Sequence, residues 1–213
     1  ASKGVQVLVV GNPCNTNCLI ALHNAPNLSP KQFYAMTRLD EHRARYQLAH
    51  KAGAQVHEVS HMTIWGNHSS TQVPDFLHAE IRGKKVPDVI LDRKWLESDF
   101  FSIVQKRGAE VIAARGKSSA ASAAHAALSA MRSIVEPHPS PKEWTSMGVY
   151  TEGNPYGIDP DLVFSFPFQS KGKGEWEIVK GIHLDSFLKE KISLTQKELK
   201  EERDLIAPLL RGK

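Results

Sequence analysis

Two apolar segments near the amino end of the chain predict buried parallel strands. Val5–Val10 is a continuous run rich in β-branched residues, and Phe33–Thr37 follows as the next candidate strand. Asn15–Asn24 fits a short helix between them, and Ser29-Pro30 has the pattern of an N-cap followed by proline at the first helical position. This order of strand, helix and strand is typical of a parallel α/β sheet.

The middle of the chain is predicted to be mainly helical, with short strands between the helices. Arg38–Ala52 has the pattern of a helix that is closed by the glycine after it. Met62–Trp65 is a short apolar segment typical of a strand, and Ala79–Val86 has the pattern of a hairpin. Asp92–Ile134 is expected to be largely helical, with a break near residues 108–116, where two glycines stand.

The last third of the chain predicts an antiparallel meander followed by a helix. Three segments separated by glycine-containing turns are expected to form its strands: Trp144–Tyr150, Leu162–Phe168 and Trp176–Val179. Thr195 and Glu198 have the spacing of a capping box, which predicts that a charged amphipathic helix begins at Thr195. The fold class is therefore α/β, with the remnant of a parallel sheet in residues 1–37 and an α+β domain of long helices and a meander in residues 38–213.

Composition and charge change this picture little. Hydrophobic residues make up 41% and charged residues 23%, close to an ordinary globular domain. The net charge is +4, but the basic residues never form a run of five or six, so a solvated surface is favoured over a nucleic-acid groove. No apolar run approaches about 18 residues, so no membrane span is expected. Two cysteines favour a reducing, cytoplasmic location over a secreted disulfide framework.

The cysteines and glycines do not form a metal site or a phosphate loop. Cys14 and Cys18 lack the second pair of ligands that a structural zinc site needs, so we interpret them as small packing residues and expect no metal. The chain contains no G-x-G-x-x-G. Gly172-x-Gly174 lies in a predicted turn, and Gly116-Lys-Ser118 has Val111 where a P-loop requires glycine.

The placement of three residues predicts a functional site: Asp40, Arg43 and His68. Taken alone, Asp40 and Arg43 have the three-residue spacing of a solvated ion pair on a helix. They stand, however, in the first turn after a predicted strand, and His68 follows the strand 62–65 at its carboxyl end. Ligands of α/β proteins collect at this edge of a sheet. If the two strand ends are neighbours, an aspartate–histidine pair with an arginine beside it is expected.

These residue types are suited to proton transfer next to a carboxylate. Histidine titrates near neutral pH and can exchange a substrate hydroxyl proton. A buried carboxylate would hold the imidazole in one tautomer and stabilise its protonated form. A guanidinium can bind a substrate carboxylate through two parallel hydrogen bonds.

The segment Ser118–Ala124 consists only of serine and alanine and is predicted to be helical. Close packing against another helix is the interpretation that we favour. Small hydroxyl residues that line a ligand pocket are the alternative.

Five segments of the chain resemble the malate dehydrogenases, and they occur in the same order along the sequence. They are "VLVVGNPCNTN", "TRLDEHRAR", "TIWGNHSSTQVPD", "RGKSSAASAAHA" and "GNPYGIDPDLVFSFP". The chain is similar over almost all its length to the cytosolic-type branch, which includes the plastid NADP-dependent enzymes. The segment "GNHSSTQVPD" favours malate over lactate as the substrate.

The resemblance implies a two-domain enzyme that interconverts L-malate and oxaloacetate with NAD(H). Residues 1–37 then correspond to the end of a Rossmann-type dinucleotide-binding domain, and residues 38–213 to the substrate, catalytic and dimerisation domain. By position, His68 resembles the proton acceptor and Asp40 the residue that orients it. The substrate-binding residues are expected to be Arg43, Asn12 and Ser119. Along the cofactor, the resemblance places Val10, Gly11 and Asn12.

The resemblance also implies what these 213 residues lack. The family's glycine-rich loop, its ribose-binding acidic residue and its mobile loop with two further arginines precede the part that matches Val5. The chain begins with Ala1, so we expect a C-terminal portion of the enzyme that is inactive alone. The plastid enzymes' C-terminal regulatory cysteines have no counterpart, because the chain ends "LLRGK".

The resemblance implies a homodimer, and no binding to nucleic acid or to a membrane is expected. The missing part leaves two further questions open: NADP is the alternative cofactor, and an organelle is the alternative location. Another NAD(P)-dependent 2-hydroxyacid dehydrogenase is the alternative enzyme. A non-catalytic module for dimerisation or binding is the alternative of a different class.

Overall fold

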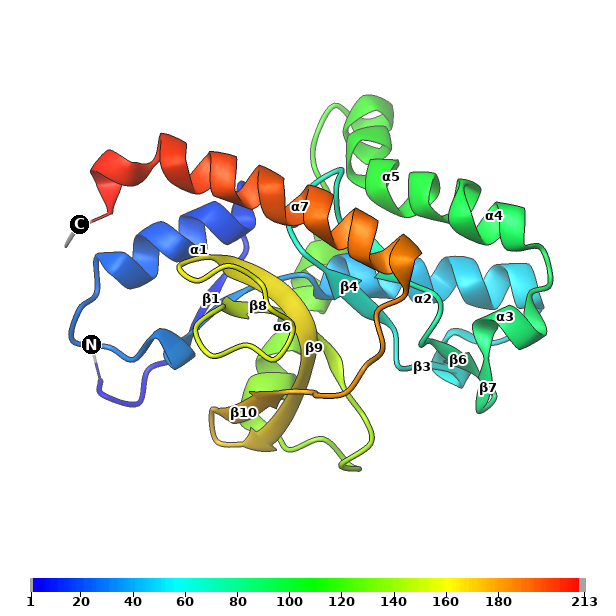
Figure 1. The fold of residues 1–213 in the computed structure, drawn as a ribbon, viewed down its shortest axis with the longest axis horizontal. Coiled ribbons are helices and arrows are strands. Elements are labelled where there is room, and N and C mark those ends of the chain that lie inside the picture. Colours follow the sequence, from blue (N-terminus) through cyan, green and yellow to red (C-terminus); the bar gives the residue numbers. More distant parts are fainter. Residues whose placement is uncertain (1, 211–213) are drawn as a thin grey trace.

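The fold combines one mixed sheet with helices, as Figure 1 shows for the computed structural model, which describes residues 2–210. The α-helices are α1 (Cys14–His23), α2 (Arg38–Ala52), α3 (Val86–Val89), α4 (Arg93–Glu97), α5 (Asp99–Arg115), α6 (Ala121–Val135) and α7 (Ser186–Leu205). The strands are β1 (Val7–Val9), β2 (Phe33–Ala35), β3 (Val59–Ser60), β4 (Thr63–Trp65), β5 (Val73–Asp75), β6 (Glu80–Ile81), β7 (Lys84–Lys85), β8 (Thr145–Tyr150), β9 (Val163–Gly172) and β10 (Glu175–Ile178). Short 3-10 turns are η1 (Pro30–Gln32), η2 (Val56–Glu58) and η3 (Ala207–Leu209).

The main sheet has five strands in the order β1-β2-β8-β9-β10. β1 and β2 are parallel, whereas β8, β9 and β10 are antiparallel neighbours. The two parts meet at the single pair Ala35 and Gly148. A Cβ atom on Gly148 would lie 2.8 Å from the Cβ of Ala35, so only glycine lets the two strands approach this closely.

Two smaller antiparallel sheets complete the strands. One has the order β3-β6-β7, and the other pairs β4 with β5. β4 also reaches the main sheet, because Gly66 directly after it forms an isolated bridge with Ser165 of β9. α7 lies across this region and contacts α1, β5 and β9, as its orange-to-red ribbon in Figure 1 shows.

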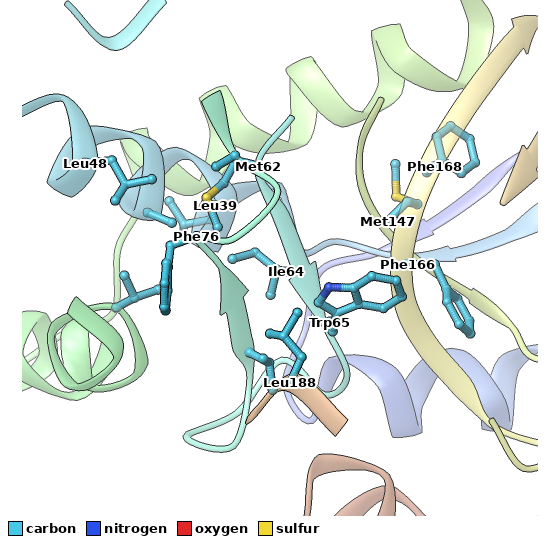
Figure 2. Close-up of a cluster of buried hydrophobic side chains, with 14 of the residues drawn as sticks. Leu39, Leu48, Met62, Ile64, Trp65, Phe76, Met147, Phe166, Phe168 and Leu188 are labelled. Carbon is cyan, nitrogen blue, oxygen red and sulfur yellow. The ribbon is translucent and has the colours of Figure 1, made fainter. Parts of the chain in front are cut away.

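Aromatic side chains fill the centre of the main core, shown in Figure 2. Trp65, Phe164 and Phe166 have no exposed surface, and Trp65 meets Tyr156 edge to face with ring centroids 4.8 Å apart. Complete burial of a phenylalanine stabilises a fold by about 1.5–3 kcal/mol. Because Trp65 anchors β4 in this core, the loop that follows Trp65 begins at a fixed position.

The α/β fold class is confirmed, and most predicted elements are present. The hairpin, the meander and the helix Arg38–Ala52 with Gly53 in a left-handed conformation form as expected. The first strand and the first helix are shorter or shifted by one residue, at Val7–Val9 and Cys14–His23. The division at residue 37 stays a proposal, and residue 1 of its first part and residues 211–213 of its second part lie outside the described residues.

The predicted break within Asp92–Ile134 is present at the Gly116 end of its range: α5 runs through Gly108, ends at Arg115, and is followed by Gly116 in a left-handed conformation. One helix prediction is wrong. α7 begins at Ser186 and not at Thr195. Its N-cap is Asp185, whose side chain accepts a hydrogen bond from the backbone N–H of Leu188 at 2.8 Å.

Across residues 2–210, none of the helices combines the length and the apolar character needed to cross a lipid bilayer.

Candidate active site

Ser165 of β9 connects the two segments that carry the candidate residues. Its backbone exchanges hydrogen bonds with Gly66 after β4, at 3.1 and 2.9 Å. Its hydroxyl lies 2.8 Å from the hydroxyl of Thr37, which precedes α2. The expected aspartate–histidine pair depended on neighbouring ends of β2 and β4, but β4 pairs with β5 and reaches β9. The start of α2 and the loop after β4 therefore meet, although by a different route from the expected one.

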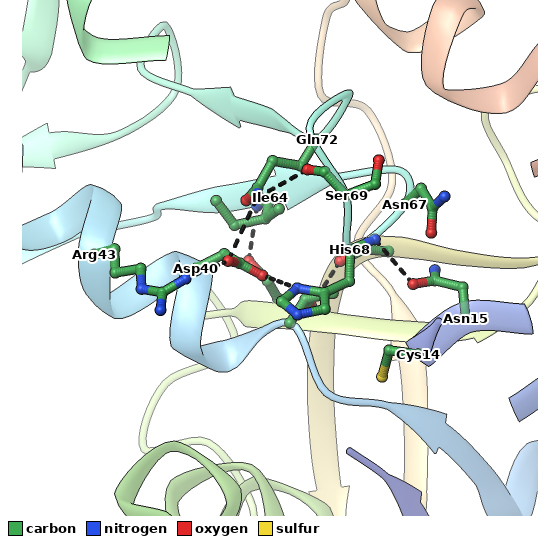
Figure 3. Close-up of polar contacts among 12 residues, drawn as sticks. Cys14, Asn15, Asp40, Arg43, Ile64, Asn67, His68, Ser69 and Gln72 are labelled. Carbon is green, nitrogen blue, oxygen red and sulfur yellow. Dashed lines mark hydrogen bonds and ion pairs between the residues drawn. The ribbon is translucent and has the colours of Figure 1, made fainter. Parts of the chain in front are cut away.

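His68 and Asp40 form a hydrogen-bonded pair at this junction, as Figure 3 shows. Nδ1 of His68 contacts Oδ2 of Asp40, whose side chain is completely buried. Within residues 2–210, no hydrogen bond engages the other ring nitrogen, Nε2. A carboxylate accepts, so the proton of the neutral imidazole belongs on Nδ1 and Nε2 has a free lone pair. The pair therefore presents a base.

Arg43 lies on the same side of α2 as Asp40. Its Nη1 is 3.4 Å from Oδ1 of Asp40, and its Nη2 donates to the hydroxyl of Ser119 at 3.3 Å. Arg43 and Ser119 both line a pocket of about 310 Å³, together with Leu39, Arg107 and Ser122. Only 16% of the Arg43 side chain is exposed, and burial, the largest effect, lowers the pKa of its guanidinium while the charge of Asp40 opposes this. The guanidinium of Arg43, bound by Asp40 and Ser119, therefore faces this pocket with its positive charge.

The charge of Asp40 controls the protonation of His68. Burial lowers the pKa of His68, but the negative charge of Asp40 and its hydrogen bond outweigh burial, and the net pKa is raised above the ordinary value. Arg43 opposes this rise through its positive charge. The protonated imidazole is therefore stabilised after it has accepted a proton.

Gln72 and Asn15 belong to this site, and neither was a sequence candidate. The side-chain amide of Gln72 donates to Oδ1 of Asp40 at 3.4 Å and to the carbonyl of Ser69 at 3.1 Å. Asn15 accepts from the backbone N–H of His68 at 2.9 Å and donates to the carbonyl of Gly66. Their type gives no signal, because an amide is usually a surface residue, and burial becomes visible only in the fold.

The three residues assigned to the cofactor lie at the end of β1 and are exposed. Val10 is 41% exposed, and a Cβ atom on Gly11 would meet nothing within 4 Å. Asn12 is exposed as well, and in the described part of the chain its side chain has no hydrogen bond that connects it to His68. Asn15, three residues later, provides the link from this segment to His68. The assignment of Val10, Gly11 and Asn12 stays a prediction.

The two cysteines are packing residues in the structure. Both are completely buried, and the thiol of Cys14 donates to the carbonyl of Val9 at 3.2 Å. Burial raises the pKa of Cys14 to about 12 and raises the pKa of Cys18 as well. Because metals bind the thiolate and not the thiol, these side chains are poorly suited to hold a metal at neutral pH.

The serine- and alanine-rich segment packs less closely than we favoured. Residues 118–120 precede α6, and most of residues 118–124 are exposed. Close packing of α6 begins at Ala126 and continues at Ala130. Ser119 and Ser122 line the pocket beside Arg43, so the alternative interpretation describes this segment better.

Comparison with known proteins identifies relatives over nearly the whole chain. Residues 37–208 match the family described as lactate/malate dehydrogenase, alpha/beta C-terminal domain. The malate dehydrogenase of Protochlamydia amoebophila is 56% identical, over 99% of this chain and 64% of that protein. The chloroplastic NADP malate dehydrogenase of Flaveria bidentis is 56% identical, over 98% of this chain and 46% of that protein.

Solved structures agree with these relatives. The malate dehydrogenase of Naegleria fowleri has a TM-score of 0.92 and 42% identity, and the match covers 99% of this chain and 63% of that one. A lactate dehydrogenase of Trichomonas vaginalis, solved in complex with NADH and oxamate, has a TM-score of 0.93 and 39% identity, with 100% and 65% covered. The chain thus spans less than two thirds of the length of each of these four proteins.

Proposed function

This chain belongs to the lactate/malate dehydrogenase family, and on that premise we propose that its protein interconverts L-malate and oxaloacetate with NAD(H). The observation that carries the proposal is the group formed by His68, Asp40 and Arg43. A base, the carboxylate that orients it and a guanidinium at a pocket are what oxidation of a hydroxyl next to a carboxylate requires. The 56% identity to a malate dehydrogenase supports malate as the substrate.

His68 and Asp40 perform the proton transfer in this proposal. Nε2 of His68 takes the proton of the substrate hydroxyl, since Nδ1 is engaged by Asp40. The charge of Asp40 stabilises the imidazolium that results, and the same ring returns the proton in the reverse reaction. The role of Asp40 is to fix the tautomer and the ring plane of His68.

Arg43 and Ser119 bind the substrate. The guanidinium of Arg43 pairs with the substrate carboxylate, and the hydroxyl of Ser119 helps to hold the guanidinium in place. This grip fixes the substrate carbon relative to His68, and such positioning contributes several kcal/mol to catalysis (about 7–11 kcal/mol at best). Asn12 is proposed as a further substrate contact.

The residues at the end of β1 fit one end of a nicotinamide dinucleotide. The open space at Gly11 lets a ligand approach the backbone, and the exposed Val10 offers an apolar surface for a ring. Val10, Gly11 and Asn12 would hold this end. When bound, the nicotinamide supplies the hydride chemistry, which no side chain of the protein can perform. The plant relatives named as NADP enzymes make NADP the alternative cofactor.

A hybrid protein tests the proposal. It joins the part of the Protochlamydia enzyme that this chain does not match to the amino end of this chain, and reduction of NAD and NADP is followed by absorbance with L-malate, L-lactate or no substrate. We expect L-malate to support reduction of NAD. No turnover with any 2-hydroxy acid would leave the chain with a non-catalytic role in dimerisation or binding.

Lactate is the second candidate substrate, because the Trichomonas protein is named a lactate dehydrogenase and superposes as well as the Naegleria malate dehydrogenase. Preference of the hybrid for L-lactate would replace malate in the proposal. The residues His68, Asp40 and Arg43 keep their roles in either case, since both substrates are 2-hydroxy acids.

The 213 residues alone are proposed to be inactive, because they contain no glycine-rich dinucleotide loop. Malate-dependent NAD reduction by the purified chain would contradict this.

A homodimer is proposed, and light scattering measures it. The cytoplasm is the proposed location, based on two free, buried cysteines; relatives named chloroplastic make the plastid the alternative, which cell fractionation decides.

A further inference from the structure

The loop that carries His68, residues 66–71, is held by one face of α7. Asn67, directly before His68, is 2% exposed and makes three hydrogen bonds to this helix. Its backbone N–H donates to Oγ1 of Thr195 at 2.9 Å. Its side-chain amide donates to Glu198 at 2.9 Å and to Glu202 at 2.7 Å. The residue before the histidine is thereby fixed in its main chain and its side chain.

Glu198 also binds the loop after His68. Oε2 of Glu198 accepts from the hydroxyls of Ser69 and Thr71, each at 2.5 Å. The hydroxyls of Thr71 and Thr195 are also 2.9 Å apart. Oε2 of Glu198 therefore binds the loop both before and after His68. Hydrogen bonds to a charged acceptor are stronger than hydrogen bonds between neutral groups.

Backbone contact adds to these hydrogen bonds. A Cβ atom on Gly66 would lie 2.2 Å from Cγ2 of Thr195, and the φ angle of Gly66 is +92°. Only glycine fits both the conformation and the space. α7 thus rests directly on the loop, and Thr195 and Glu198 face it because residues three apart share one side of a helix.

We infer that Thr195 and Glu198 are positioning residues for His68: they fix the loop at residues 66–71 so that the imidazole stays aligned with Asp40. This inference rests on the proposed role of His68 as the proton acceptor. It assigns no substrate contact to α7. The short bonds to Asn67, Ser69 and Thr71 would hold the loop main chain, while among residues 2–210 His68 itself is held by Asp40 and Asn15.

Titration of His68 by NMR in this chain measures the alignment without any turnover. The charged groups that face His68 are Asp40 and Arg43, and Glu198 adds a negative charge behind the loop. Thr195→Val removes a hydroxyl but no charge, so it separates positioning from electrostatics. Glu201→Gln is the matched control, because Glu201 lies on the same helix with 65% of its side chain exposed.

We expect Thr195→Val and Glu198→Gln each to shift the titration midpoint of His68 downwards, since a loose loop weakens its bond to Asp40. Thr195→Ser keeps the hydroxyl and should retain the midpoint of the unchanged chain, as should Glu201→Gln. An unchanged midpoint in Thr195→Val would overturn the inference. So would an equal shift in Glu201→Gln and Glu198→Gln, because that result indicates charge alone. If Thr195→Val fails to fold, Thr195→Ala takes its place, because it also removes the hydroxyl and no charge.

The hybrid protein gives a second readout. Thr195→Val should lower kcat by about tenfold with little change in KM, because misplacement of the base affects the proton transfer and not substrate binding. A rise in KM at constant kcat would contradict a positioning role. Failure of the proposed function is recognised separately, since an inactive hybrid leaves the NMR result on His68 intact.

Discussion

Two histidine–aspartate pairs in this protein have similar local geometry but very different surroundings. In the pair His78–Asp75, Nδ1 of the histidine lies 2.8 Å from an oxygen of a completely buried carboxylate. In His68–Asp40, Nδ1 also contacts a completely buried carboxylate. The histidine side chains are 21% and 15% exposed. Burial and contact alone therefore do not distinguish a catalytic pair from a structural one.

The other partners of each aspartate make the difference. Asp75 accepts from the indole of Trp65 at 3.0 Å and from the backbone N–H groups of Leu77 and His78 at 3.0 and 3.2 Å. These bonds close a turn and anchor a core tryptophan. Asp40 is bound instead by the guanidinium of Arg43, which lines a pocket, and by the amide of Gln72. The first carboxylate holds the fold, and the second holds the proposed base and the proposed carboxylate-binding group.

The largest expected effect is on turnover. In the hybrid protein, His68→Asn should lower kcat by about 10²–10⁴-fold, because general acid–base catalysis contributes this much. His78→Asn is the matched control and should change kcat by less than about twofold, since away from the reacting atoms a substitution alters only stability. Initial rates of malate-dependent reduction measure both. Equal losses of kcat in His68→Asn and His78→Asn would show that the two pairs do not differ in their role in turnover, in spite of their different surroundings.

Stability should show the opposite order. In this chain, Asp75→Ala leaves the indole N–H of Trp65 and two backbone N–H groups without their acceptor, so the free energy of unfolding should fall by about 3 kcal/mol or more. Asp40→Ala should cost about 1 kcal/mol, because the side chains of Arg43 and His68 are 16% and 15% exposed and can bind water instead. Urea unfolding measures both. A larger loss for Asp40→Ala would mean that Asp40 also has the main structural role.

The pH dependence of stability follows from His68. Its pKa in the folded chain is raised by Asp40 against the effect of burial, so its contribution is fully present below the unfolded pKa of about 6.5 and is lost as pH rises through the folded pKa. The unfolding free energy of the unchanged chain, relative to His68→Asn, should therefore fall with rising pH in this window. In Asp40→Asn burial dominates, and the relative stability should rise with pH instead. Urea unfolding between pH 5 and 9 is the measurement.

The sequence was sufficient for the central residues of the site but not for the way they meet. Asp40, Arg43 and His68 were predicted together because each follows a recognisable strand. The link through Ser165 was not predictable, since it depends on a strand more than 90 residues beyond His68 in the chain. Long-range pairings of this kind leave no local pattern in the sequence.

The misplaced start of α7 has an informative cause. Thr195 and Glu198 have the spacing of a capping box, but the real N-cap is Asp185. The two residues instead direct the same hydrogen-bonding atoms to the loop around His68. A threonine and a glutamate three positions apart on one helix face can bind a helix end or a neighbouring loop equally well. Only the fold distinguishes these uses.

The smallest expected effect concerns Ser119, which has no counterpart at the His78 pair. In the hybrid, Ser119→Ala removes the acceptor of the 3.3 Å bond from Arg43, and a single hydrogen bond contributes about 0.5–1.5 kcal/mol. This predicts a rise of about two- to tenfold in KM for malate with little change in kcat, because the bond orients the carboxylate-binding group in the ground state and the transition state alike.

Ser118→Ala is the matched control for this measurement, since Ser118 is exposed and its hydroxyl has no hydrogen bond within the described part of the chain; its backbone carbonyl accepts from Arg115 at 3.4 Å. The control should leave KM unchanged. A fall in kcat alone for Ser119→Ala would show that Ser119 acts on the proton transfer and not on Arg43. The cation at the pocket would then be held by Asp40 alone, and the contrast between the two aspartates would become sharper, because Asp40 would position both the base and the carboxylate-binding group.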